Sequence, residues 1–205
     1  MTTHMTNRPD RRAVLCTGFA AAAMAGLPVP ALALNDSSAK ALVDRVVADI
    51  NRVISSGASV NRMIRDFEGI FSRYADVNII ARSTLGADSR RASAAQMRAF
   101  TEAFKGYIAR KYGKRFRQFV GGQIQVEDVR RVKSWHEVIS TAYLRGEPPF
   151  EVRFLVSDRS GQDLFFDMVI EGVSLRLSER TEIGAMLDAR RGDIDALIRD
   201  LRNAG

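Results

Sequence analysis

Residues 150–157 (FEVRFLVS) and 164–170 (LFFDMVI) decide the fold class of this chain. In the first segment apolar residues alternate with Glu151 and Arg153, which is typical of a strand with one buried face. In the second, every other residue from Leu164 is apolar. Only a short polar turn with a glycine separates the two segments. They therefore predict two adjacent strands of an antiparallel sheet.

The flanking sequence extends this pattern on both sides. Two more strands are predicted over residues 123–132 and 135–144, after the Gly121-Gly122 break. Short turns join all four strands, which argues against a parallel nucleotide-binding sheet with crossover helices. Helical spacing of apolar residues is found over 36–56, 59–71, 76–86, 93–119 and 178–201. This order predicts an α+β fold: a helical layer packed on a curved antiparallel sheet of about four strands.

Composition excludes several classes of protein. The 205 residues are 46% hydrophobic and 27% charged, which is typical of a folded domain and not of a disordered chain. A single cysteine excludes a disulfide framework and a cysteine-rich zinc site, and two histidines leave little room for a metal centre. Motifs for phosphate-binding loops, zinc proteases and serine hydrolases do not occur. We therefore expect no cofactor or metal.

Residues 1–33 have the composition of an export signal. Three arginines precede an apolar stretch that ends in Ala31-Leu32-Ala33, the small residues that a signal peptidase requires. Arg11-Arg12 also resembles a twin-arginine signal, so the export route stays open. A membrane anchor is the alternative, but two prolines interrupt the stretch. The sequence predicts a cleaved signal peptide over 1–33, a single domain over 34–205 and a periplasmic location.

The net charge of +7 divides between these parts. Three arginines and one aspartate place +2 in residues 1–33, which leaves +5 on residues 34–205. The basic residues cluster near the end of the long predicted helix, where they suit the helix dipole. A solvated face, an anionic membrane surface or an acidic partner would each explain them, whereas export argues against nucleic acid. They are Lys105, Arg110, Lys111, Lys114, Arg115 and Arg117.

Catalytic candidates are few. His136 is the only histidine of residues 34–205 and lies beside Glu137, so it could act as a general base. Asp167 shares one face of a predicted strand with Asp163, but no second set of acids or donors accompanies them. An edge position is the simpler explanation for His136. We expect no enzymatic activity, and a small α+β enzyme using His136 or Asp167 remains an alternative hypothesis.

An aromatic stripe on the long predicted helix faces the predicted strands. Its members recur at helical spacing, and the strands opposite carry further large apolar residues. A dry core and an apolar cavity for acyl chains need the same residue types at the same spacing. Both interpretations therefore stay open on the pattern alone.

Several blocks of the sequence resemble one family. They are residues 71–77 with Leu85-Gly86, the Ser93–Gln96 start of the long helix with its aromatic residues, residues 166–175, and residues 192–198. In order and spacing, from about residue 39 to 202, they are similar to the MlaC family, also called toluene-tolerance proteins. The resemblance implies a monomeric periplasmic phospholipid carrier that supports outer-membrane lipid asymmetry. It would shuttle lipid between an outer-membrane lipoprotein complex and the lipid-binding ring of an inner-membrane ABC transporter.

The resemblance also implies an apolar pocket that holds the acyl chains, with the head group near its mouth. Some relatives lie beside genes for hopanoids, so another lipid cargo stays open. A shift of one register step in the strands would exchange the inward and outward faces. The candidate lipid-binding residues are Phe100, Phe104, Tyr107, Ile108, Tyr112, Val138, Tyr143, Phe154, Phe166, Met168 and Val173.

Overall fold

The computed structural model describes residues 1, 2 and 34–205. Nearly all of the predicted signal peptide lies outside the described residues. The elements from residue 36 onward share one apolar core, to which helices and strands both contribute.

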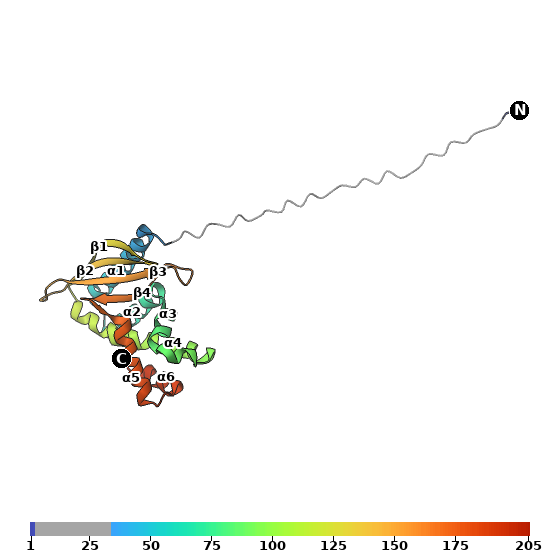
Figure 1. Cartoon of the computed structure of the whole chain (residues 1–205). Helices are drawn as coiled ribbons and strands as arrows, with labels where there is room; N and C mark the ends of the chain where they lie inside the picture. Colours follow the sequence, from blue (N-terminus) through green and yellow to red (C-terminus); the bar gives the residue numbers. More distant parts are fainter. Residues whose placement is uncertain (3–33) are drawn as a thin grey trace. The chain divides into compact units, whose positions relative to one another are not determined.

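The sheet is a five-stranded antiparallel meander in which each strand pairs with the next along the chain (Figure 1). Its strands are β1 (Gln123–Val132), β2 (Trp135–Tyr143), β3 (Phe150–Ser157), β4 (Leu164–Ile170) and the two-residue β5 (Val173–Ser174). The predicted α+β fold with an antiparallel sheet is confirmed. Only β5 was not expected, and its length explains why it leaves no periodic signal.

Two β-bulges interrupt the ladder. On β1 the pairing with β2 shifts between Val126 and Asp128. On β4 the extra residue is Phe166, so that Met168 pairs with Phe154 while Phe165 pairs with Val156. Directly paired residues lie on the same face, and a bulge changes which residues of a strand share that face. Phe165 and Met168 therefore both lie on the inner face, which strict alternation along β4 does not predict.

Among residues 34–205, six α-helices accompany the sheet, and the regularity of their apolar spacing explains why the sequence predicts them. They are α1 (Asp36–Ser55), α2 (Val60–Tyr74), α3 (Val77–Leu85), α4 (Ala94–Gly113), α5 (Leu175–Ala189) and α6 (Ile194–Asn203). Short 3-10 helices follow α3 and α4, over Gly86–Arg90 and Lys114–Phe119. Capping boxes begin α1 and α4, which satisfies backbone N–H groups that a helix start leaves open.

The long helix is shorter than predicted. Helical spacing continues to Phe119, but α4 ends at Gly113 and the chain continues as a 3-10 helix. At Gly113 the backbones of α4 and α2 nearly touch, since a Cβ atom there would lie 2.8 Å from Cα of Ile64. Only glycine permits this approach, and it anchors α4 against α2.

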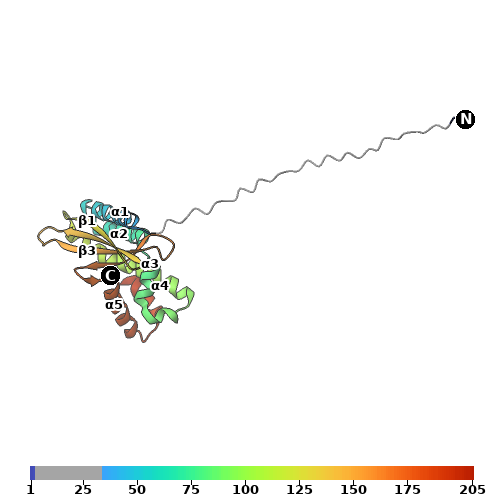
Figure 2. The same cartoon turned by 45° about the horizontal axis from the view of Figure 1, so that its top comes forward.

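The helices enclose the inner face of the sheet. Helix α1 lies against β1, where the Asn51 side chain both accepts from the Ile124 N–H and donates to its carbonyl at 2.9 Å. Figure 2 shows α1 and α2 along one side of the molecule and α5 at the other end. On β2 the alternate residues from His136 to Ala142 are buried, whereas those between them are partly exposed. One face of the sheet is therefore covered and the other is partly open to solvent.

Candidate functional site

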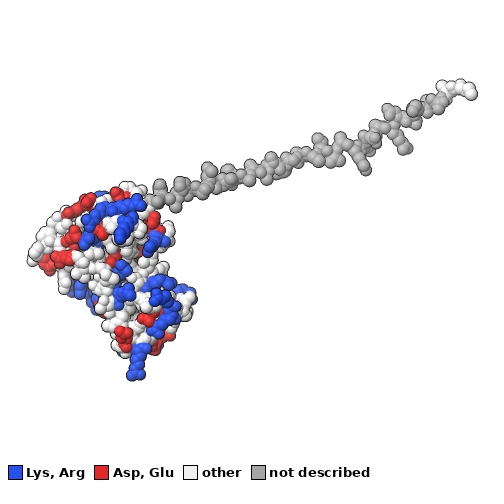
Figure 3. Space-filling view, in the orientation of Figure 1, with Lys and Arg blue, Asp and Glu red and all other residues white. Residues whose placement is uncertain are grey.

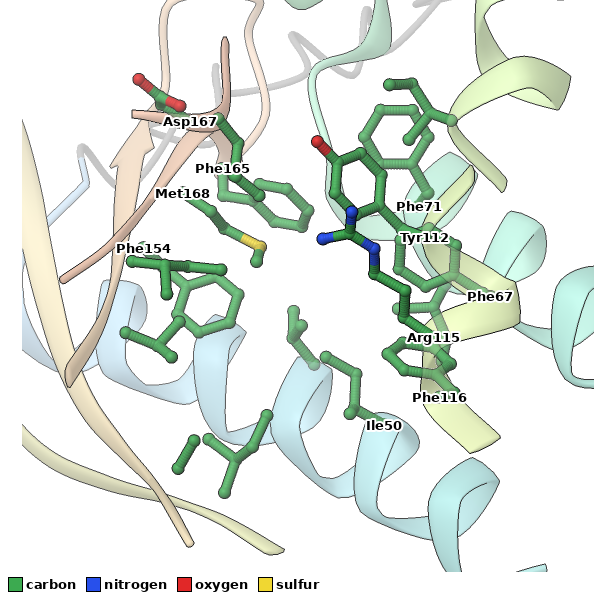
Figure 4. Close-up of a pocket in the computed structure, with 18 of the residues that line it drawn as sticks. Ile50, Phe67, Phe71, Tyr112, Arg115, Phe116, Phe154, Phe165, Asp167 and Met168 are labelled. Atoms are coloured by element: carbon green, nitrogen blue, oxygen red, sulfur yellow. The ribbon is translucent and has the colours of Figure 1, made fainter. Parts of the chain in front are cut away.

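A cavity of about 310 Å³ lies between the inner face of the sheet and helices α1, α2 and α4. Apolar side chains form most of its wall, and Figure 4 shows them converging from the sheet on one side and the helices on the other. They include Val46, Ile50 and Ile54 of α1, Phe67, Ile70 and Phe71 of α2, Phe104 and Ile108 of α4, and Ala142, Val152, Phe154, Phe165, Met168 and Ile170 of the sheet.

Phenylalanine is the most frequent residue of this wall: nine of the eleven phenylalanines in the chain line the cavity. Neighbouring rings support one another, as Phe67 does with Phe116 at a centroid distance of 4.9 Å and Phe154 with Phe165 at 5.7 Å. Edge-to-face contacts of this kind are favourable and fix the ring orientations. The wall is therefore built from rigid groups that contact each other around an open space.

Five polar residues interrupt the apolar lining: Tyr112, Arg115, Asp167, Arg176 and Glu179. Asp167 and Arg176 have structural partners. The Asp167 carboxylate accepts hydrogen bonds from the Ser174 hydroxyl at 2.6 Å and the Arg176 backbone N–H at 3.0 Å, at the start of α5. The Arg176 guanidinium donates to the Ser83 hydroxyl at 2.6 Å. These two side chains fix α5 to β4 and α3.

Arg115 differs from them. It is exposed at its outer side, and its guanidinium lies 5.7 Å from the centre of the Tyr112 ring, a cation–π contact. Figure 4 shows Arg115 and Tyr112 side by side, both projecting toward the cavity. Arg115 makes no hydrogen bond or ion pair with any residue in the described part of the chain. It is therefore a charged donor available at the cavity.

A polar cluster, buried at Glu179 and open to solvent at Glu182, joins α4 to α5 beside the cavity. Lys111 donates to Glu179 at 2.7 Å, to Glu182, and to the Tyr107 hydroxyl at 3.1 Å. The Tyr112 and Tyr107 hydroxyls donate to Glu179 and Glu182. Burial, together with these hydrogen bonds to carboxylates, raises the pKa of both tyrosines.

The same contacts favour the charged forms of Lys111 and Glu182. Burial alone would lower the pKa of Lys111, but its hydrogen bonds to Glu179 and Glu182 outweigh this and raise it. Likewise burial opposes ionisation of Glu182, yet the bonds from Lys111 and Tyr107 lower its pKa. Lys111 is thus an ammonium group between two carboxyl groups, and it bridges α4 and α5.

Six of the eleven candidate lipid-binding residues line the cavity: Phe104, Ile108, Tyr112, Phe154, Phe166 and Met168. The other five lie elsewhere. Phe100 and Val138 are fully buried in the core, and Tyr107 is engaged with Glu182. Tyr143 and Val173 are exposed, because β2 ends at Tyr143 and Val173 belongs to the edge strand β5.

Sequence reasoning missed a large part of the wall. The sequence predicts Ile50, Phe67 and Phe71 as buried faces of helices but gives them no role in a cavity, although they line it. Strict alternation along the strand also predicts Phe165 on the face opposite to Met168, whereas both line the cavity. The spacing of the α1 and α2 residues is the spacing of any buried helix face. The concentration of phenylalanine on α2, the 3-10 helix after α4, and β4 is the signal that could have indicated them.

The proposed catalytic residues do not meet in one place. His136 does not line the cavity; it is buried on β2, with its Nε2 3.0 Å from the Asp36 carboxylate of α1. Asp167 is committed to the start of α5. Within residues 34–205 no three histidine, cysteine or acidic side chains are grouped as they would be around a metal ion.

Four of the six basic residues at and after the end of α4 have partners among the described residues. Arg110 donates to the carbonyl groups of Leu201 and Ala204 at the end of α6, and Lys114 donates to that of Gly205. Lys105 pairs with Glu102. On the face drawn in Figure 3, basic side chains form separate groups with acidic ones between them. Three of the six clustered cations, Arg110, Lys111 and Lys114, therefore contact the carboxyl-terminal helices or the last residue of the chain.

Comparisons with known proteins agree with this architecture. A family model described as "MlaC protein" matches residues 40–203. No curated protein matches the chain. Among solved structures, the phospholipid-binding protein of Ralstonia solanacearum in complex with a phospholipid superposes with a TM-score of 0.68 at 19% identity, covering 80% of this chain and 94% of that one. None of the helices among the described residues has both the length and the apolar character that a membrane span requires. Since the family model matches most of its length, this chain belongs to the MlaC family.

Proposed function

We propose that this protein binds a phospholipid and holds its acyl chains in the cavity between the sheet and helices α1, α2 and α4. The observation that carries this proposal is the lining: nine phenylalanines around about 310 Å³ of space. This volume lies at the lower end of the usual range for ligand sites, about 300–1,000 Å³. Each methylene group that leaves water gains about 0.8 kcal/mol, so such a wall favours hydrocarbon chains.

The polar residues give the ligand an orientation. Arg115 is the one cation of the lining without a hydrogen-bond or ion-pair partner among the described residues, and arginine matches the geometry of a phosphate group. We place the phosphate of the lipid at Arg115 and the acyl chains toward Phe154 and Phe165. This arrangement leaves the head group near solvent, because Arg115 is exposed at its outer side.

Family membership and the phospholipid-bound Ralstonia solanacearum protein support this assignment. They also favour a binding protein over an enzyme, as do the separate commitments of His136 and Asp167. In the cell, the protein would carry lipid through the periplasm as a monomer. Its partners would be an outer-membrane lipoprotein complex and the lipid-binding ring of an inner-membrane ABC transporter. Export would use the signal peptide predicted over residues 1–33.

Extraction of the purified protein with organic solvent, followed by mass spectrometry, tests the proposal. We expect about one phospholipid per protein, and transfer of labelled phospholipid from vesicles to protein stripped of lipid. A protein that carries no lipid and accepts none from vesicles would refute phospholipid binding. Recovery of a hopanoid or another terpenoid lipid instead would retain the carrier and change the cargo.

A further inference from the structure

The cavity reaches solvent at one end of the sheet. Phe154, in the middle of β3, is fully buried. The lining residues Leu144, Phe150 and Ile170 are partly exposed, and they lie together where β2 ends, β3 begins and β4 ends. Opposite the sheet, Arg115 is exposed and also lines the cavity (Figure 4). The mouth of the cavity therefore lies between this end of the sheet and the 3-10 helix after α4.

The exposed apolar side chains of the domain gather at this mouth. Single exposed apolar residues are normal on a protein surface when they are scattered. Here each of them adjoins the lining, either as the chain neighbour of a lining residue or, for Val173, by pairing with the lining residue Ile170. Among residues 34–205, the large apolar residues with exposed side chains are Val120, Tyr143, Val173 and Leu177.

These four residues form two pairs, one on each side of the mouth. Val120 and Tyr143 belong to segments in close contact, since a Cβ atom on Gly122 would lie 2.6 Å from the carbonyl oxygen of Tyr143. Val173 is on β5, and Leu177 is in the first turn of α5 directly after it. Strands β2 and β5 are three strand spacings apart, about 14 Å, with β3 and β4 between them. The two pairs are therefore too far apart to cover one another.

Basic residues accompany the pair that contains Val120. The Arg145 guanidinium lies against the neighbouring Gly121, where a Cβ atom would be 3.2 Å from Nη2. The 3-10 helix that precedes Val120 adds three exposed cations. Four basic and two acidic residues give this helix and the β2–β3 and β4–β5 turns a net charge of +2. They are Lys114, Arg115, Arg117, Arg145, Glu147 and Glu171.

A lipid surface fits this arrangement better than a protein partner does. A stable protein interface buries a contiguous, close-packed core, whereas the apolar residues here are two separate pairs. The surface of a bilayer is fluid and accepts isolated apolar side chains between its head groups. Basic residues beside them are attracted to anionic head groups. The combination of separated apolar tips and adjacent cations therefore points to a membrane.

We propose that this end of the protein docks directly on an anionic phospholipid surface. The two apolar pairs insert between the head groups, and the basic residues lie at the phosphates. The mouth then faces the bilayer, so that an acyl chain passes between membrane and cavity without crossing water. This inference rests on the proposed phospholipid binding and adds the surface at which the lipid is exchanged.

Flotation of the purified protein with vesicles tests the inference. One set of vesicles contains equal amounts of phosphatidylglycerol and phosphatidylethanolamine, and the other contains phosphatidylcholine alone. Protein that has only taken up a lipid stays at the bottom of the gradient, so flotation measures attachment to the membrane. We expect the protein to float with the anionic vesicles at low ionic strength and to be released by salt, which screens the attraction. Protein that never floats with the anionic vesicles would overturn the inference and leave a protein as the partner of this surface.

Surface variants assign the attachment to this end of the molecule. Val173→Ser/Leu177→Ser removes one apolar pair, neither member of which lines the cavity, and should lower partitioning into anionic vesicles about tenfold. Arg145→Gln should lower it about fivefold, the usual effect of one cation near an anionic surface. Arg131→Gln is the control, because Arg131 is exposed and pairs with His136 at the opposite end of the sheet. It should float like the unaltered protein.

Two results with these variants would contradict the docking surface. One is undiminished flotation of the double serine variant, with circular dichroism confirming that it is folded. The other is an equal loss in Arg145→Gln and Arg131→Gln, which would indicate attraction by overall charge and no defined docking end.

Extraction and mass spectrometry of the same samples separate this inference from the proposed function. Protein that carries phospholipid but does not float refutes membrane docking and leaves phospholipid binding in place. Protein that floats but carries no lipid and accepts none refutes phospholipid binding and leaves the docking surface.

Discussion

Lys111 is predicted to be the most important charged residue for stability, and Lys111→Met tests this directly. Methionine keeps an unbranched side chain but removes the ammonium group. Its loss leaves Glu179, which is 3% exposed, with only the Tyr112 hydroxyl as donor. Removing one partner of a buried ion pair typically costs about 3–5 kcal/mol. We expect a loss of about 3 kcal/mol, at the lower end of that range, because Tyr112 still donates.

The assay is urea unfolding followed by circular dichroism on protein stripped of lipid. Stripping matters because a bound ligand adds its own free energy to the folded state. In a domain of this length, a loss of about 3 kcal/mol also corresponds to a fall of roughly 6–12 °C in Tm. Glu182→Gln is the comparison: its carboxylate side chain is 47% exposed, so solvent screens its pair with Lys111. Its effect should stay below about 1 kcal/mol.

A double variant decides whether the cost comes from the stranded carboxylate. The double variant Lys111→Met/Glu179→Met removes both charged side chains. It should therefore be less destabilised than the single variant Lys111→Met. Such recovery is expected where the penalty is an unpaired buried charge and not lost packing. If Lys111→Met costs less than 1 kcal/mol, or if the two changes add without recovery, the account of this cluster is wrong.

Three further predictions address packing, the cavity and acid stability. Gly113→Ala should lower the free energy of unfolding in urea by about 1–3 kcal/mol, because its Cβ would lie 2.8 Å from the α2 backbone. Gly69→Ala is the control: its Cβ would meet open space, so the free energy of unfolding should rise by up to about 1 kcal/mol. Ala142→Phe places a ring in the cavity and should reduce extracted lipid about tenfold or more, by mass spectrometry, with near-normal folding. Burial opposes ionisation of Asp49, but hydrogen bonds from Arg52 and Tyr74 outweigh it and lower its pKa below 3.8. The stabilising contribution of the Asp49 carboxylate is therefore present above pH 3.8 and is lost as the pH falls through the pKa of Asp49 in the folded protein. Asp49→Asn should accordingly lower the free energy of unfolding at pH 7 and make its decrease in acid less steep, as measured by urea unfolding across that pH range.

The strands were predictable almost to the residue because each is a period-two pattern bounded by polar turns. All strands of the prediction occur, and β1 has the predicted bounds Gln123–Val132. The exception is local: the bulge at Phe166 moves Phe165 onto the inner face. A bulge depends on pairing with β3, which is a tertiary property, so the alternation within residues 164–170 alone cannot indicate it.

The end of α4 was not predictable for a similar reason. Helical spacing runs through residue 113 without interruption, and glycine within a helix is only a weak stop signal. At Gly113 the helix packs closely against Ile64 of α2, a neighbour far away in sequence that no local pattern indicates. Arg110 and Lys111 in the last turn of α4 gave a clear signal of charge, but their partners, the carbonyl groups of α6 and the carboxylates of α5, depend on how the helices pack.

Periodicity could not separate a core from a cavity, but the kind of apolar residue does. Away from the cavity the core is mainly aliphatic, with Leu42 and Val43 of α1 and Leu197 and Leu201 of α6, although Phe100 is also buried there. Leucine and valine fill space efficiently in close-packed interiors. Around the cavity nine of the apolar residues are phenylalanine, whose rigid rings brace one another edge to face and cannot fold into a gap between them. An inner surface built of such rings remains open in the absence of a ligand, which is what a protein that must both accept and release an acyl chain requires.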